Sequence, residues 1–224
     1  MASFKLNIAK VRGCPPAGEL AVAMESFALP ETEEFGVLNC TGTAETVFAT
    51  IIRKTQQAVQ RLDAETAQVT AAAVEKVSVY PIGIRPESEV LEIYAGPASA
   101  IEQVGVFLGS CLALPTVTEP IEIDIPAAIE KLAGLTERFS LRSIRVSEYA
   151  HNSYMAGPYA PKFLDSQHGL DFLNQYADFV KTASVRFQGP SGRVNLNLTP
   201  AASFSFSCNE DDQPVVQSIL RKLA

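Results

Sequence analysis

The sequence predicts an α+β fold, in which mainly antiparallel sheets built from hairpins and meanders carry helices on one face. Apolar and polar residues alternate in short segments such as Phe4–Ile8 and Val194–Leu198, which is typical of strands with one buried face. Turn sequences rich in glycine and proline separate several of these segments. Stretches with apolar residues at helical spacing follow groups of strands, which favours segregated helices over a parallel βαβ arrangement.

The first third of the chain is predicted to contain three strands and a helix. The strands are expected over residues 4–9, 20–24 and 37–40. Thr43 is a suitable N-cap, and apolar residues recur at helical spacing over Val47–Leu62. No glycine or proline interrupts residues 43–80, so the helix either continues or breaks near Asp63 into a second helix over 64–74. A break is favoured because one helix of about 30 residues is long for a globular domain.

The rest of the chain is predicted as hairpins followed by helices. Strands are expected over residues 77–80, 90–94, 120–125, 141–149, 185–187, 194–198 and 204–206, with an irregular strand or loop over 154–163. Helices are expected after Pro97, from Pro126, after a Ser166 cap, and over 215–223. The predicted core of the last third is formed by Phe187, Leu196, Phe204, Phe206, Ile219 and Leu220.

The two ends of the chain resemble each other when Cys40 is placed on Cys208. Residues 47–52 then fall on 215–220 with a similar apolar stripe. One interpretation is an internal pseudo-repeat of three strands and a helix, and the other is that amphipathic segments look alike. We expect two units, 1–115 and 116–224, or one continuous domain.

Composition excludes several classes of protein. The 224 residues are 47% hydrophobic with a net charge of −7, so the chain is a globular, acidic protein, and a general phosphate-binding surface is disfavoured. No apolar run is long enough to cross a bilayer, and Met1–Lys5 lacks the pattern of a signal peptide. The four cysteines form no CxxC pair. We therefore expect a cytoplasmic protein that does not associate with membranes.

Catalytic chemistry has two candidate locations. His151 and His168, the two histidines of the chain, bracket a polar and aromatic loop over residues 151–171 that includes Tyr154. Glu122 and Asp124 are two residues apart on the predicted strand 120–125, where paired carboxylates could bind a metal or share a proton. Ordinary surface roles remain the alternative for both. No phosphate-binding loop and no nucleophile elbow occurs, so neither a cofactor nor a metal is expected.

A polar strand face near the C-terminus is the main candidate binding surface. If Gln188 pairs with Arg193 across the turn, the side chains of six polar residues share one face: Ser184, Arg186, Gln188, Arg193, Asn195 and Asn197. Ser203, Ser205 and Ser207 alternate in the same way on the next strand. This face has two arginines and no carboxylate in an acidic chain, which indicates either a recognition surface or a merely soluble sheet face.

The leading hypothesis is a non-catalytic binding or assembly protein that uses this face to bind a protein partner or to self-associate. The expected binding residues are Arg186, Arg193, Asn195, Asn197, His151, Tyr154 and His168. One alternative is a hydrolase-like enzyme that uses the 151–171 loop or the Glu122/Asp124 pair. The other is nucleic-acid binding, disfavoured by the net charge, through Arg142, Arg145, Arg186 and Arg193.

Overall fold

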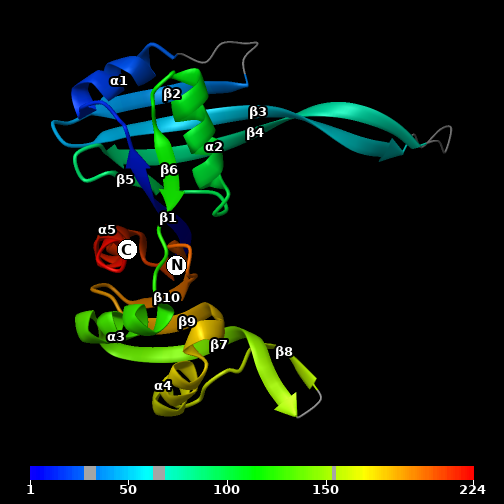
Figure 1. Ribbon diagram of the computed structural model, residues 1–224, viewed down its shortest axis with the longest axis vertical. Helices are drawn as coiled ribbons and strands as arrows, with labels where there is room; N and C mark the ends of the chain where they lie inside the picture. The colour runs from blue at the N-terminus through cyan, green and yellow to red at the C-terminus, as the bar shows by residue number, and fades with distance from the viewer. Residues whose placement is uncertain (28–33, 63–68, 153–154) are drawn as a thin grey trace. The chain divides into compact units, whose positions relative to one another are not determined.

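The computed structural model describes residues 1–27, 34–62, 69–152 and 155–224 (Figure 1). It confirms the mixed class, with helices and one large antiparallel sheet. The chain separates into two compact units, and each unit is described by itself below. Unit 1 contains Met1–Lys10, Glu92–Ile101 and Glu119–Ala224, and unit 2 contains Val11–Leu91 and Glu102–Thr118. The expected boundary between residues 115 and 116 stays a prediction.

Unit 2 is built around the strands β2 (Phe35–Gly42), β3 (Val47–Leu62), β4 (Val69–Arg85) and the first two residues of β5 (Val90–Ile93), which lie in that order in the sheet. Its helical segments are α1 (Ala17–Glu25), most of α2 (Ala100–Val106) and a π-helical turn over Phe107–Cys111. β6 (Val117–Pro120) follows. The predicted hairpin around residues 85–89 is confirmed by β4 and β5.

The predicted helix over Val47–Leu62 is wrong, because this segment is β3. Val47, Ala49 and Ile51 are buried and face Tyr80–Ile84 of β4, so burial in a sheet overrides the helical spacing. Residues 69–74 of the second predicted helix belong to β4, and Asp63 and residues 64–68 lie outside the described residues. The Thr43 side chain accepts a hydrogen bond from the Thr46 N–H at 3.0 Å, so it stabilises the β2–β3 turn instead of capping a helix.

Two further predictions for the first third need correction. Residues 20–24 belong to α1, in which Ala17, Leu20, Ala21 and Met24 are buried at helical spacing. The structure does not show the internal repeat, because residues 47–52 form a strand whereas their counterparts at 215–220 lie in α5 (Gln213–Arg221).

Unit 1 carries most of β1 (Ala2–Arg12) and the strands β7 (Glu137–Asn152), β8 (Met155–Tyr159), β9 (Val180–Gln188), β10 (Arg193–Leu198) and β11 (Ser203–Cys208). The order in the sheet is β1-β11-β10-β9-β7-β8. Its helices are α3 (Ile125–Leu135), α4 (Ser166–Gln175) and α5, with 3₁₀ turns over Ala177–Phe179 and Glu210–Asp212. Within the described residues, no helix is long and apolar enough to cross a membrane.

Two helix starts in unit 1 differ from the prediction. The expected strand over 120–125 is wrong, since β6 ends at Pro120 and the Asp124 carboxylate accepts a hydrogen bond from the Ala127 N–H at 3.0 Å to cap α3. The cap of α4 is Asp165 and not Ser166, because the Asp165 carboxylate accepts from the Gln167 N–H at 3.2 Å.

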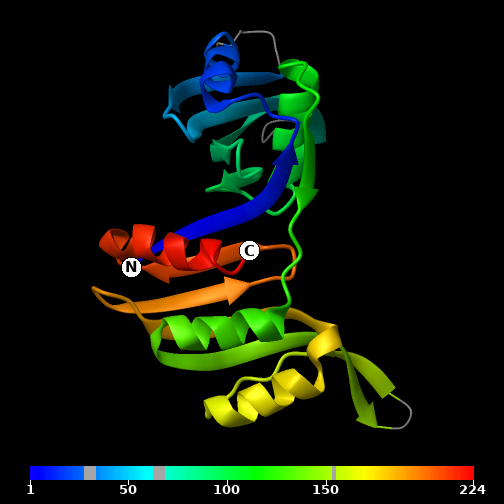
Figure 2. The same cartoon turned by 60° about the vertical axis from the view of Figure 1, so that its left-hand side comes forward.

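The apolar side of the unit 1 sheet forms its core. α3 and α5 run along one side of these strands (Figure 2). Five of the six predicted core residues are buried, namely Phe187, Leu196, Phe204, Phe206 and Leu220, and Ile219 is half-buried. The strands therefore have the predicted phase, and their alternate side chains occupy the opposite face of the sheet.

Candidate binding surface

The polar residues of five neighbouring strands in unit 1 are aligned in two rows. One row follows the register Ser3, Ser207, Asn195, Arg186 and Ser140, and the next follows Lys5, Ser205, Asn197, Ser184 and Ser143. Residues that are directly opposite in an antiparallel pair point to the same face of the sheet. We call this side the polar face, and it also contains Gln188, Arg193, Glu137 and Arg145.

The predicted pairing that underlies the polar face is confirmed. Arg193 is the register partner of Gln188, and Asn195 is the partner of Arg186. Lys5, Arg193 and Asn197 are exposed, and Arg186 and Asn195 are half-buried. The face is therefore accessible from solvent, in contrast to the side that α3 and α5 cover.

A chain of hydrogen bonds holds the centre of the polar face. Arg186 Nε donates to Asn195 Oδ1 at 3.0 Å, and Asn195 Nδ2 donates to Ser207 Oγ at 3.3 Å. Because the Asn195 amide engages only one edge of the guanidinium, the Nη donors of Arg186 are left for a partner. The side chain is thus oriented before any partner binds.

The polar face carries four cations, Lys5, Arg145, Arg186 and Arg193. Arg145 belongs to it because its register partner Thr182 is two residues before Ser184 on β9. In the part of the chain that the structure describes, none of the four forms an ion pair. Their donors are therefore available to an anionic group.

The predicted hairpin face has no carboxylate of its own, but the neighbouring strand β7 adds one to the polar face. Glu137 on β7 is exposed and is the register partner of Gln188, so one acidic side chain lies at the corner of the face. β7 pairs with β9 through several register shifts, which the sequence does not reveal. The face still has three more cations than carboxylates among the residues that define it.

A surface depression of about 250 Å³ lies on the β1, β10 and β11 part of this face. It is lined by Ser3, Phe4, Lys5, Asn195, Asn197, Ser205, Phe206 and Ser207. The lining offers amide and hydroxyl groups and one ammonium group, which can bind carboxylates or peptide groups. None of its side chains is a histidine or a carboxylate that could activate a serine, so the depression is suited to binding.

His168 does not join this surface. His168 is 84% exposed on α4, and its Nδ1 lies 2.7 Å from the Asp165 carboxylate. The Gln167 N–H, which donates to Asp165, and then the His168 contact lower the pKa of the Asp165 carboxyl. His151 lies near the end of β7, and Tyr154 lies outside the described residues. The His168–Asp165 contact is a local arrangement at a helix start.

The Glu122 and Asp124 carboxylates lie at the start of α3, where Asp124 is engaged as the cap. Both line a depression of about 340 Å³ together with Asp178. Among the residues described by the structure, no three His, Cys, Asp or Glu side chains are placed to hold a metal ion. The arrangement supports a helix cap and offers no assembled acid–base pair.

Sequence reasoning missed Lys5 as a member of the candidate site and did not place Arg145 on this face. Ser3, Lys5 and Asn7 alternate with apolar residues, so their shared face was visible in the sequence. What was not visible is that β1 pairs with β11, about 200 residues later in the chain.

No family model matches this chain, and no curated protein shows a significant similarity to it.

Proposed function

We propose that this chain is a non-catalytic binding or assembly protein whose polar face contacts an acidic surface of a protein partner. One observation carries the proposal. Four cations from β1, β7, β9 and β10 lie on one accessible face without ion-pair partners among the described residues, although the chain has a net charge of −7. On a surface that is only solvated, cations are usually interspersed with carboxylates, so an excess of cations on one face indicates a binding role.

An acidic protein surface suits this face better than nucleic acid does. The polar side chains between the cations are serines and asparagines, which hydrogen-bond to carboxylates and peptide groups. The rows contain no aromatic side chain on which a base could stack. The negative charge of the whole chain also opposes a long polyphosphate strand. Binding to nucleic acid is therefore an outcome that the test must be able to detect.

The test compares two variants with the same change in charge. The polar-face variant is Lys5→Gln/Arg186→Gln/Arg193→Gln. The control is Lys10→Gln/Lys131→Gln/Lys222→Gln, whose three residues are exposed and are not among those that define the polar face. We expect the wild type and the control to bind a poly-L-glutamate peptide, and the polar-face variant to bind it at least about tenfold more weakly.

The unfolding midpoint of the control is expected to stay close to that of the wild type, because exposed charges contribute little to stability. That of the polar-face variant is expected to be slightly lower, because the half-buried Arg186 loses its hydrogen bond to Asn195. Equal affinity in the polar-face and control variants contradicts the proposal. Tighter binding of an oligonucleotide than of poly-L-glutamate, lost in the polar-face variant, would assign the surface to nucleic acid instead.

A further inference from the structure

A long two-stranded ribbon extends beyond the other strands of unit 2 (Figure 1). We call it the arm, formed by Lys54–Leu62 of β3 and Val69–Val79 of β4. β2 pairs with β3 only as far as Arg53. β5 has four residues and follows β4 through a four-residue turn, so it can pair only with the last residues of β4. Beyond Lys54, whose N–H donates to the Glu34 carbonyl at 2.7 Å, no further strand pairs with the outer edge of β3 among the described residues, and the outer edge of β4 is likewise open before its last residues.

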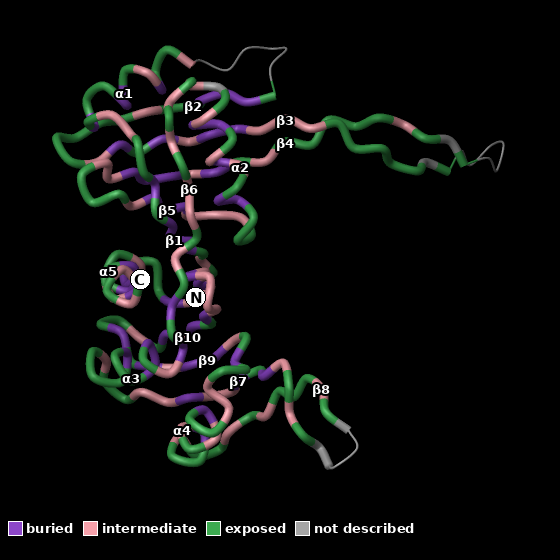
Figure 3. The backbone as a smooth tube through the Cα atoms, in the orientation of Figure 1, coloured by how far each residue is buried: buried purple, intermediate pink, exposed green. Residues whose placement is uncertain are grey.

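The arm exposes apolar side chains to solvent, and its tube is coloured mainly as exposed or intermediate (Figure 3). The exposed fractions are 42% for Val59, 65% for Leu62, 61% for Val69, 49% for Val74 and 50% for Val77. A two-stranded hairpin without further strands is at best marginally stable in water. The arm therefore gains stability from any strand that pairs with it.

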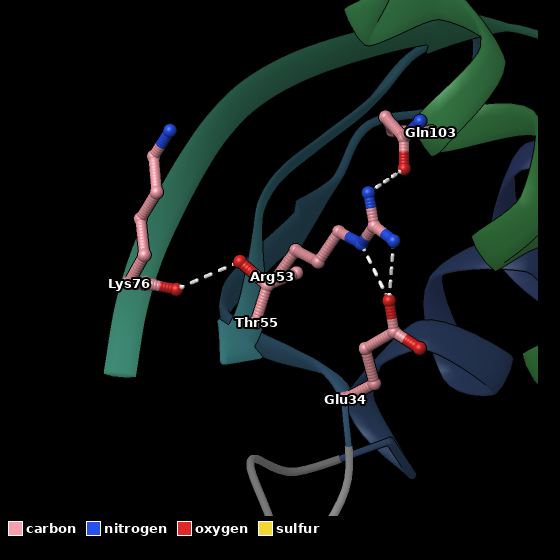
Figure 4. A network of polar contacts seen from close by, with 5 residues as sticks. All are labelled: Glu34, Arg53, Thr55, Lys76 and Gln103. Carbon is pink, nitrogen blue, oxygen red and sulfur yellow. Dashed lines mark hydrogen bonds and ion pairs between the residues drawn. The ribbon is translucent and has the colours of Figure 1, made fainter. Parts of the chain in front are cut away.

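The base of the arm is fixed by polar contacts (Figure 4). Arg53 Nε donates to Glu34 Oε1 at 2.6 Å, and Arg53 Nη1 donates to Gln103 Oε1. The guanidinium also lies 5.4 Å from the centre of the Phe35 ring. Thr55 Oγ1 donates to the Lys76 carbonyl at 3.4 Å across the two strands. The arm is thus held in a defined direction from its root.

Proline, glycine and bulges, which often protect an open strand edge, are missing from the β4 side of the arm. β3 and β4 pair over their described length without a register shift, and Val69–Val79 contains no proline or glycine. Four of its eleven residues are valine, and Glu75 and Lys76 cancel in charge. An exposed edge segment without net charge, proline or a bulge can pair with a copy of itself.

The distribution of charge favours a second copy of this chain as the partner of the arm, and β4 as the strand whose edge pairs with it. Residues 54–78 have a net charge of zero, from the bases Lys54, Arg61 and Lys76 and the acids Asp63, Glu65 and Glu75. The whole charge of −7 therefore lies outside residues 54–78, so two copies repel least where these residues meet. The β3 edge, 54–62, has two cations and no acid, whereas the β4 edge is neutral. Self-pairing is thus favoured at β4.

We propose that the β4 edge of the arm pairs with the same edge of a second copy of this chain. The two strands run antiparallel about a two-fold axis at Val74, so that Val74 faces its own copy and Val69 faces Val79. Registers centred on Glu75 or Lys76 would place like charges opposite each other. The result is a continuous four-stranded ribbon, β3-β4-β4-β3, and three or more strands suffice for independent stability.

The full-length chain tests this pairing by sedimentation velocity and by cross-linking. We expect a concentration-dependent dimer, and we expect Val74→Cys to form a disulfide-linked dimer on mild oxidation. Gln57→Cys is the matched control, because Gln57 is the register partner of Val74 on the β3 side of the same arm. A covalent dimer from Gln57→Cys and none from Val74→Cys overturns the proposal, as does a wild type that stays monomeric.

A charge variant provides an independent measurement. Val74→Lys places two ammonium groups opposite each other at the axis, and we expect it to raise the dimer dissociation constant by about tenfold. Val59→Lys is the control on β3 and is expected to leave the dimer unchanged, since Val59 is similarly exposed. Equal weakening by both variants contradicts the assignment to β4. The polar-face variant should dimerise normally, so a failure of this proposal is distinguishable from a failure of the proposed function.

Discussion

Glu92 in β5 is a carboxylate with only 1% of its surface exposed, and Arg221 forms an ion pair with it. Arg221 at the end of α5 donates from Nε to Oε1 at 2.7 Å and from Nη2 to Oε2 at 2.9 Å. The Tyr94 hydroxyl donates to Oε2 at 2.7 Å. Because both carboxylate oxygens are satisfied, this buried charge joins the last helix to residues more than a hundred positions earlier.

Removing the Arg221 cation should take away its compensation of the buried Glu92 charge. We expect Arg221→Met to lower the free energy of unfolding by about 2–4 kcal/mol, measured by urea denaturation, since the apolar stem is kept and only the charge is lost. Arg193→Met, at an exposed site, should change it by less than about 0.5 kcal/mol. Adding Glu92→Gln to Arg221→Met should recover part of the loss, and no recovery would show that the carboxylate is not the cause.

Tyr94 makes the stability of the folded chain dependent on pH in the alkaline range. Burial, and then the hydrogen bond to Glu92, raise the pKa of the Tyr94 hydroxyl to about 12 from its ordinary value of 10.0. The folded chain thus keeps a proton that the unfolded chain loses, so stability that is present below pH 10 falls as the pH rises from 10 towards 12. Tyr94→Phe should have a flatter stability profile in this range, and identical slopes would contradict the assignment.

At the scale of elements, strands whose pairing partners follow closely in the sequence could be predicted, whereas the long hairpin formed by β3 and β4 could not. β10, β11 and residues 183–188 of β9 alternate between apolar and polar residues, and short turns join these strands, so both their phase and the Gln188–Arg193 pairing follow from the sequence. In β3 and β4, alanine, glutamine and lysine favour a helix locally, and the apolar residues fit both periods. Only pairing with the other strand decides between them.

The same contrast holds for the candidate site. Arg186, Arg193, Asn195 and Asn197 were placed on one face because they lie within one hairpin. The positions of Lys5 and Glu137 on this face could not be predicted. They depend on how β1 and β7 pair with other strands, and these pairings involve long-range contacts and bulges that no local pattern encodes.

Arg53 lies at the root of the arm, and its side-chain contacts there allow a prediction about this element. We expect Arg53→Ala to increase the amide exchange rate of residues 54–58 and 73–78 by several-fold, because the contacts to Glu34 and Gln103 oppose local opening of the root. The exchange of β10 and β11 in unit 1 should not change. Uniform acceleration throughout the chain would instead indicate a loss of global stability.

At the scale of the whole molecule, charge is distributed unevenly between the units. Unit 1 contains twelve Lys and Arg against thirteen Asp and Glu, and unit 2 contains six against twelve. The net charges are therefore −1 and −6, and the polar face lies in the nearly neutral unit. An acidic partner that approaches this unit meets little repulsion, which supports a contact that depends on the local cations.

The most direct measurement of this account is the salt dependence of poly-L-glutamate binding by the wild type and the polar-face variant. Calorimetric titrations would be made in a series of sodium chloride concentrations from about 0.05 to 0.5 M, over which the screening length falls severalfold. We predict that the wild type binds poly-L-glutamate and that its affinity declines steadily as the salt concentration rises. The polar-face variant is predicted to show neither this binding nor this salt dependence. An affinity that does not change with salt, or that survives the loss of Lys5, Arg186 and Arg193, would contradict the assignment of the polar face as the binding surface.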